Sequence, residues 1–228
     1  MQMHDALRHT PGGAALSALA AAFGATPEQV AAAMHVVGSE LAWHLEKNTL
    51  SRCGLADLVE AIGRGEHAKL LAGGDAFRGE AMRAEGNAIL QHILGTKDRS
   101  RALAARAARR SGLNEETLRA MLPSLAVVTM AGLASRAKNS LRKVLSVMPS
   151  LGSWSRGSPH ADLADILRRG CGAGPYAKGR LRRVVRTAVV GGGSFRPRGA
   201  LRWYLHFMLA RPVRAPIGRL LTRFGGRR

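Results

Sequence analysis

The stretch EGNAILQHILGTKDRS, residues 85–100, decides between a nucleotide-binding fold and a helical one. A phosphate-binding P-loop needs the pattern GxxxxGK[ST] directly after a strand. Gly86 and Gly95 are too far apart for that pattern, and Gly95 is followed by Thr-Lys rather than Lys-Thr. Apolar residues recur instead at helical steps, at Ile89, Leu90, Ile93 and Leu94. We therefore predict a helix that Asn87 caps and that Gly95 ends in a left-handed turn.

The rest of the first half also favours helices. Thr26-Pro27-Glu28-Gln29 has the pattern of a capping box with proline in the first turn. An apolar stripe then follows at Val30, Met34, Val37, Leu41 and Leu45. Further helices are expected over 55–63, 68–74, 98–110 and 114–134, and no stretch here alternates like a strand. The sequence predicts an all-α fold of five to six helices, with these residues buried together: Leu90, Ile93, Leu118, Leu122 and Leu125.

Two of the expected helices resemble each other. Residues 23–45 align with residues 111–133, so that Gly24 matches Gly112 and the cap Thr26 matches the cap Asn114. Identity is low, and two interpretations fit. The segments are either a pseudo-symmetric pair of long core helices or two ordinary capped helices.

Charge divides the chain of 228 residues into two parts. Residues 1–135 hold 14 Lys/Arg and 13 Asp/Glu, which gives a net charge of +1. Residues 136–228 hold 21 Lys/Arg and two Asp/Glu, which gives a net charge of +19. Such a difference is typical of a globular domain with a basic tail. We expect a helical domain over 1–145, a linker over 146–159, and a largely disordered, basic Arg/Gly-rich tail with short helices over 160–228. The short apolar runs of the tail are separated by Gly and Pro, so we expect no shared core among them.

The tail carries candidate polyanion-binding residues. Its arginines and aromatic residues suit either single-stranded nucleic acid, by phosphate pairing and stacking, or the surface of an anionic membrane. A third interpretation is that the sequence beyond about residue 165 is a reading of the gene out of frame. The candidates are Arg180, Arg182, Arg183, Arg186, Arg202, Trp203, Tyr204 and Phe207.

Residues 98–122 offer a second route to nucleic acid, because they resemble a helix-turn-helix. Gly112 would lie in the turn and residues 114–122 would form the reading helix. The preceding helix supplies arginines for phosphates at Arg99, Arg106, Arg109 and Arg110. Glu115 and Glu116, however, lie where a DNA phosphate would approach, and a capped helical hairpin explains the same residues more simply.

Catalytic and metal-binding patterns are sparse. Glu40 and His44 lie one helical turn apart, but a metal site needs three or four ligands and the sequence gives no third. Cys53 and Cys171, the two cysteines, form neither a disulfide framework nor a zinc pattern. We expect Cys53 to be structural and His92 to be a half-buried helix residue rather than a ligand. The sequence predicts no catalytic residues, no metal and no cofactor.

Residues 85–136 resemble the YidB-like family of uncharacterised bacterial proteins. That family shows a GNxILxHxFG segment, a charged step, an alanine-rich helix, a Gly-Leu turn and a Leu-Pro helix. The matching residues are Gly86, Asn87, Ile89, Leu90, His92, Gly95, Lys97, Gly112, Leu113, Leu122 and Pro123. With 12–34 and 54–71, the resemblance covers roughly residues 10–136. It implies an all-helical bacterial domain with no established reaction, and it supplies no catalytic residues.

Together these observations favour a non-enzymatic interaction or assembly module. Its partner is an unknown protein or a second copy, with nucleic acid or an anionic membrane as alternatives through the tail. We expect a cytoplasmic location, because no apolar run approaches the length of a spanning helix and the first residues lack the basic start of an export signal.

Overall fold

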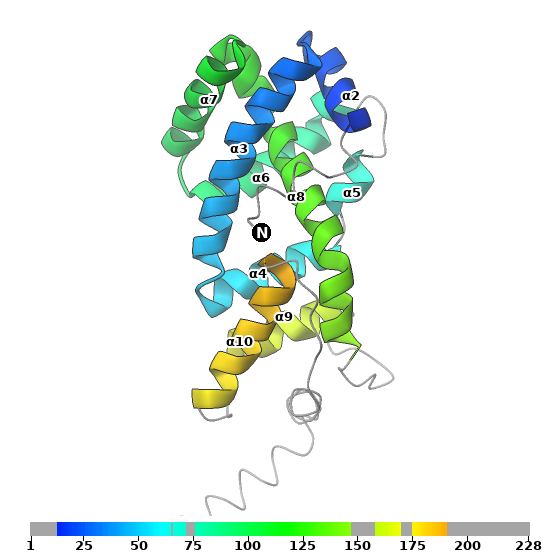
Figure 1. Ribbon diagram of the computed structural model, residues 1–228, viewed down its shortest axis with the longest axis vertical. Coiled ribbons are helices and arrows are strands. Elements are labelled where there is room, and N and C mark those ends of the chain that lie inside the picture. The colour runs from blue at the N-terminus through cyan, green and yellow to red at the C-terminus, as the bar shows by residue number, and fades with distance from the viewer. Residues whose placement is uncertain (1–12, 65, 72–75, 147–157, 170–174, 191–228) are drawn as a thin grey trace, which may run out of the picture.

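The computed structural model describes residues 13–64, 66–71, 76–146, 158–169 and 175–190, and its regular elements in these residues are all helical. Figure 1 shows their arrangement. The all-α prediction is confirmed, with more helices than the five or six expected. In chain order they are α2 (Gly13–Phe23), α3 (Pro27–Asn48), α4 (Arg52–Arg64), α5 (Glu66–Leu71), the 3-10 helix η1 (Ala76–Arg78), α6 (Glu80–Leu94), α7 (Lys97–Ser111), α8 (Glu115–Leu145), α9 (Pro159–Arg169) and α10 (Pro175–Val190).

The two long helices α3 and α8 begin as the sequence predicts. The Thr26 hydroxyl accepts a hydrogen bond from the Gln29 amide at 3.3 Å, and the Gln29 side chain accepts one from the Thr26 amide at 3.0 Å. Asn114 accepts a bond from the Thr117 amide at 2.6 Å. Two residues before each cap a glycine has a left-handed backbone, with φ of 63° at Gly24 and 72° at Gly112. The aligned segments therefore share one local design, a left-handed glycine followed by a capped helix.

Helix α6 ends where it was expected to end but begins earlier. Gly95 closes it with φ of 81°, as predicted. The expectation that Asn87 caps the helix is wrong, because α6 starts at Glu80 and Asn87 lies exposed in its interior. The earlier start buries Met82 one turn before Gly86 and so lengthens the apolar face of the helix.

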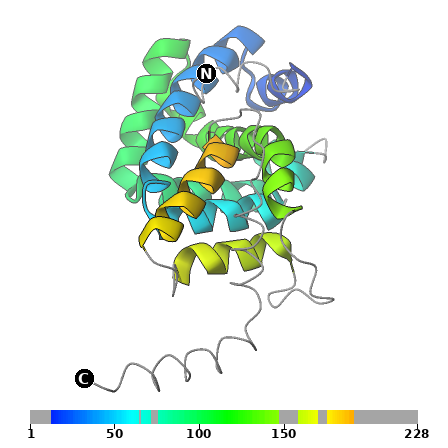
Figure 2. The same ribbon diagram turned by 60° about the horizontal axis from the view of Figure 1, so that its bottom comes forward.

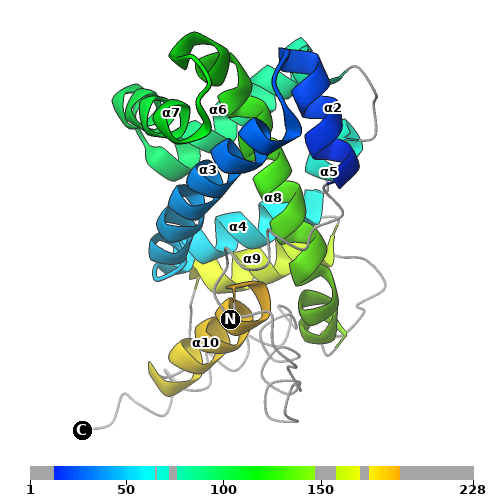
Figure 3. The same cartoon turned by 45° about the horizontal axis from the view of Figure 1, so that its top comes forward.

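The core is arranged around α8, which runs along most of the molecule in Figure 3. Helix α6 packs across it, and α3 and α7 pack against each other and against α8. The five residues predicted to be buried together are all buried, and the prediction is confirmed. Gly86 marks the crossing of α6 and α8, since a Cβ atom there would lie 2.2 Å from the Pro123 carbonyl oxygen. The two backbones therefore touch with no side chain between them.

Helix α8 corrects the expectation that no apolar segment approaches the length of a membrane-spanning helix. Among the described residues it is the one helix long and apolar enough to cross a membrane, with a mean hydropathy of 1.4 over its most apolar window. About two thirds of that window, 67%, is buried inside the protein. The burial follows from the position of α8 at the centre of the bundle, and a core helix passes the same test of length and composition.

Helices α9 and α10 also correct the sequence analysis, because both belong to the same core. Figure 2 shows α9 beside α4 and α10 across the same end of the bundle. Side chains of both helices are fully buried there: Leu163, Ala164, Leu167, Val185, Ala188 and Val189. The expectation that the short apolar runs of the basic part share no core is therefore wrong for these two. Helix α9 packs mainly on α4, about a hundred residues earlier in the sequence, and α10 packs mainly on α8.

Candidate binding sites

Two of the predicted polyanion-binding arginines lie against the end of α3. Arg182 donates a hydrogen bond to the Leu50 carbonyl at 3.0 Å, and Arg186 donates one to the Thr49 hydroxyl at 3.3 Å. Both therefore attach α10 to the turn after α3. Arg183 is exposed, whereas the side chain of Arg180 is not described. Arg202, Trp203, Tyr204 and Phe207 lie outside the described residues, so polyanion binding by this set stays a prediction.

The Glu40–His44 pair serves the packing of α3 against α7. Arg106 of α7 binds Glu40 at 2.8 Å, and His44 lies 3.9 Å from the same carboxylate oxygen. Burial lowers the pKa of His44, against the opposing charge of Glu40. In the described parts of the chain, no group of three His, Cys, Asp or Glu side chains is placed to hold a metal ion. Cys53, expected to be structural, is exposed in the first turn of α4.

The helix-turn-helix pattern folds as a core hairpin. Helices α7 and α8 join through the left-handed Gly112, which is the turn that the pattern requires. Leu118, Met121 and Leu122 of the second helix are buried in the core, whereas Glu115 and Glu116 are exposed. This geometry would present the carboxylates of Glu115 and Glu116 to the phosphates of DNA.

A charged cleft of about 300 Å³ lies between α4, α6 and α9. Arg168 of α9 bridges Asp57 at 2.7 Å and Glu60 at 2.6 Å, both on α4. The hydrogen bond from Arg168 is the main reason why the pKa of Glu60 is lowered, and the two carboxylates raise the pKa of Arg168. The charges at this end of the cleft therefore bind each other and hold α9 on α4.

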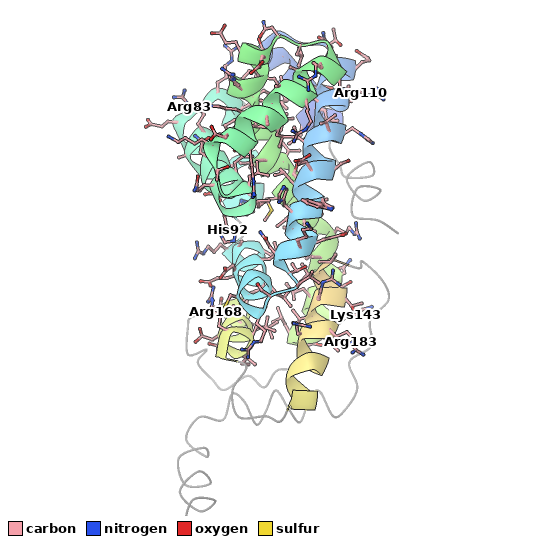
Figure 4. All side chains as sticks on the ribbon, turned by 90° about the vertical axis from the view of Figure 1, so that its left-hand side faces the viewer. Arg83, His92, Arg110, Lys143, Arg168 and Arg183 are labelled. Atoms are coloured by element: carbon pink, nitrogen blue, oxygen red, sulfur yellow. The ribbon has the colours of Figure 1, made fainter. Side chains whose placement is uncertain are left out.

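Histidines line the same cleft. The buried His67 lies 3.2 Å from Glu85, and the Nε2 atom of His92 lies 4.0 Å from Asp57. His92 is more exposed than the half-buried position that the sequence suggested, with 58% of its side chain accessible. Figure 4 shows His92 and Arg168 on the same side of the molecule.

A surface near the end of α3 exposes large apolar side chains. Trp43 is 52% exposed and Leu50 is 57% exposed. The Lys47 ammonium lies 3.7 Å above the centre of the Trp43 ring, and Arg182 reaches the Leu50 carbonyl. We call Trp43, Lys47, Leu50 and Arg182 the Trp43 surface. The sequence held a signal for it, because Trp43 falls outside the buried stripe of its helix.

A groove of about 370 Å³ lies between α6, α7 and α8. Its polar lining is cationic or neutral, with no carboxylate among the lining residues. The polar side chains are Asn87, Gln91, Lys97, Ser100, Arg101 and Arg119, and the apolar ones are Leu90, Ala104, Leu122 and Pro123. No local sequence pattern indicates this groove, because three helices contribute to it and Asn87 has the residue type of a helix cap.

Comparison with known proteins agrees with the resemblance seen in the sequence. No curated protein and no solved structure matches the chain significantly. A family model described as "Bacterial protein of unknown function (DUF937)" matches residues 5–136, the part that contains α2 to α7, the first two thirds of α8 and the groove between α6, α7 and α8. The match covers more than half of the chain, and YidB-like proteins are consistent with it. The protein therefore belongs to the DUF937 family of bacterial proteins of unknown function.

Proposed function

We propose that the protein is a non-enzymatic interaction module that binds another protein through the Trp43 surface. The observation that carries the proposal is the exposure of Trp43 near the end of α3 and of Leu50 just after it, whereas the other large apolar side chains of the described residues are buried or partly buried. Such exposure is costly in water, and a contiguous apolar surface is typical of a partner site.

The chemistry of the partner follows from the charges around these two side chains. Lys47 lies over the Trp43 ring, and Arg182 lies at Leu50. Both cations are exposed, whereas Glu46 on the same turn is half-buried. A partner that presents acidic residues around an apolar side chain complements this surface in both charge and polarity.

Support for a non-enzymatic role comes from the contacts of the ionisable side chains. Arg168 binds both Asp57 and Glu60 at the charged cleft, and Arg106 binds Glu40. These groups hold helices together at α4–α9 and α3–α7. These ion pairs are sufficient to explain why the charged residues are present, without a role for them in a reaction.

The proposal predicts that a photo-crosslinking amino acid at position 43 captures one defined protein in living bacteria. The same amino acid at position 110, which is exposed on α7, serves as the control and should not capture it. The captured protein is then purified, and its affinity for the unmodified chain is measured by calorimetry. Trp43→Ala should weaken binding by about 2 kcal/mol or more, as truncation of a central interface Trp does. Trp43→Phe should retain part of the affinity.

Three outcomes contradict the proposal. The two positions can capture the same proteins, or the purified partner can bind the Trp43→Ala variant as tightly as the original chain. A second copy of this chain captured at position 43 would make the surface an assembly interface and overturn the choice of partner. The thermal melt of Trp43→Ala should be almost unchanged, because the side chain is half exposed, so a loss of binding cannot be ascribed to unfolding.

A further inference from the structure

We infer that the groove between α6, α7 and α8 binds a small nucleoside phosphate. This inference is independent of the Trp43 surface. The groove has a volume of about 370 Å³, which is within the range of small-molecule sites in proteins. It combines cations, amide side chains and an apolar floor, which are the three kinds of contact that a mononucleotide needs.

The cations supply the site for the phosphate. Lys97 and Arg101 lie one turn apart at the start of α7, and Arg119 faces them from α8. Arg101 pairs with Asp98 at 3.1 Å and Arg119 pairs with Glu115, each through one terminal nitrogen. A guanidinium has five N–H donors, so both retain donors for a ligand. Lys97 makes no ion pair with any described residue.

The position of Lys97 in α7 supports a ligand. Positive side chains in the first turn of a helix oppose the helix dipole and are unfavourable there. Lys97 is the first residue of α7, directly after the N-cap Thr96, and the acidic residue of the same turn, Asp98, is paired with Arg101. A bound phosphate would offset this cost, because both the lysine and the amides at the start of the helix attract it.

The amides supply contacts for a heterocyclic base. Asn87 and Gln91 lie one turn apart on the exposed face of α6 and both line the groove. Gln91 donates one hydrogen bond to the Gly95 carbonyl at 3.0 Å, which leaves its own carbonyl oxygen as an acceptor. Asn is unfavourable in the middle of a helix, and the Asn87 side chain makes no hydrogen bond to another described residue. Amides of this kind pair with the edge of a base through one donor and one acceptor.

The floor of the groove is apolar. Leu90, Ala104, Leu122 and Pro123 form it, and the crossing of α6 and α8 at Gly86 fixes the distance between its walls. Pro123 has no N–H to donate along the helix, so the Arg119 carbonyl lacks its usual partner in the groove wall. A base in the groove would cover the small accessible parts of Leu90 and Leu122, each 4% exposed, with the phosphate directed to the start of α7.

The experiment titrates the full chain with AMP, adenosine and inorganic phosphate, at about 150 mM salt to weaken binding by dispersed charge. Binding is followed by calorimetry and by amide NMR shifts. AMP should bind with saturation and shift the amides of residues 87, 91, 97 and 100. Adenosine and inorganic phosphate should each bind at least about tenfold more weakly, since each lacks half of the contacts.

Matched variants assign the contacts. Lys97→Ala combined with Arg101→Ala should weaken AMP binding by about tenfold or more. Asn87→Ala should weaken the binding of AMP but not that of inorganic phosphate. Arg110→Ala removes an exposed cation of α7 that does not line the groove, and it should leave the affinity for AMP unchanged.

Several results would overturn the inference. AMP can fail to saturate, or inorganic phosphate can bind as tightly as AMP, which would make the site a simple anion site. Arg110→Ala can weaken binding as much as the double variant, which would show attraction by overall charge. The NMR shifts of the unmodified chain test the location without any variant, so shifts confined to other residues would also reject it.

Discussion

At the scale of single residues, Gly86 determines how close the two central helices come. A Cβ atom at this position would lie 2.5 Å from the Pro123 Cα and 2.2 Å from the Pro123 carbonyl oxygen. These are backbone atoms of a core helix, and they have no flexible end that could move aside. The Gly-Asn pair of the sequence thus has two separate roles: Gly86 permits the crossing, and Asn87 faces the groove.

Gly86→Ala should therefore destabilise the protein, although Ala is the better helix former by about 1 kcal/mol. The expected loss is about 1–3 kcal/mol, as for other insertions into packed interiors. The neighbouring change Asn87→Ala is the control, and it should raise stability slightly because it lies exposed in the same helix. Denaturant melts of the three chains measure both effects. Equal stability of Gly86→Ala and the original chain would show that α6 and α8 can separate without cost.

At the scale of helices, α9 is docked on α4 by contacts of different kinds. Arg168 forms ion pairs with Asp57 and Glu60 at one point. At another, His160 lies against Gly63, where a Cβ atom would be 2.3 Å from the His160 Cβ. Burial lowers the pKa of His160, so the folded protein holds this imidazole neutral over a wider pH range than the unfolded chain does.

The sign of the resulting pH dependence follows from proton binding. Below the unfolded pKa of about 6.5, the unfolded chain binds a proton at His160 that the folded protein takes up only at lower pH. The contribution of neutral His160 to the free energy of unfolding is therefore complete above pH 6.5. It is lost as the pH falls through the lowered pKa that His160 has in the folded protein. Melting temperatures should decrease over this interval. His160→Gln cannot titrate and should show a smaller decrease, whereas an unchanged slope would place the acid sensitivity at other groups such as His44.

The sequence revealed those elements whose signals are local. Thr26, Asn114 and Gly95 mark helix ends by their own side chain or backbone, and each was predicted correctly. Asn87 was misjudged because a helix cap and an exposed residue inside a helix look alike when the start of the helix is not known. The packing of Leu163 and Leu167 could not be seen, because their partner helix lies about a hundred residues earlier. The groove was missed for the same reason, since three helices contribute to it.

At the scale of the whole molecule, the basic part of the chain contributes to the core at least as far as Val190. A chain that ends at Ser146 loses α9 and α10 and exposes the surface of α4 on which α9 packs. We expect it to be less stable than a chain that ends at Val190 by at least about 3 kcal/mol, given about 1.5–3 kcal/mol for each large apolar side chain of α9 that is buried. Denaturant melts of the two chains measure the difference. Equal stability would instead support a domain that is complete at residue 145.

The pairing of α4 with α9 also has a consequence in time. Helix α4 is synthesised about a hundred residues before α9, and bacterial ribosomes add roughly 5–20 residues per second. For roughly 5–20 seconds during the synthesis of each chain, the surface of α4 on which α9 packs has no partner helix. The nascent chain is therefore most vulnerable to aggregation and most dependent on chaperones in the interval between the completion of α4 and the emergence of α9.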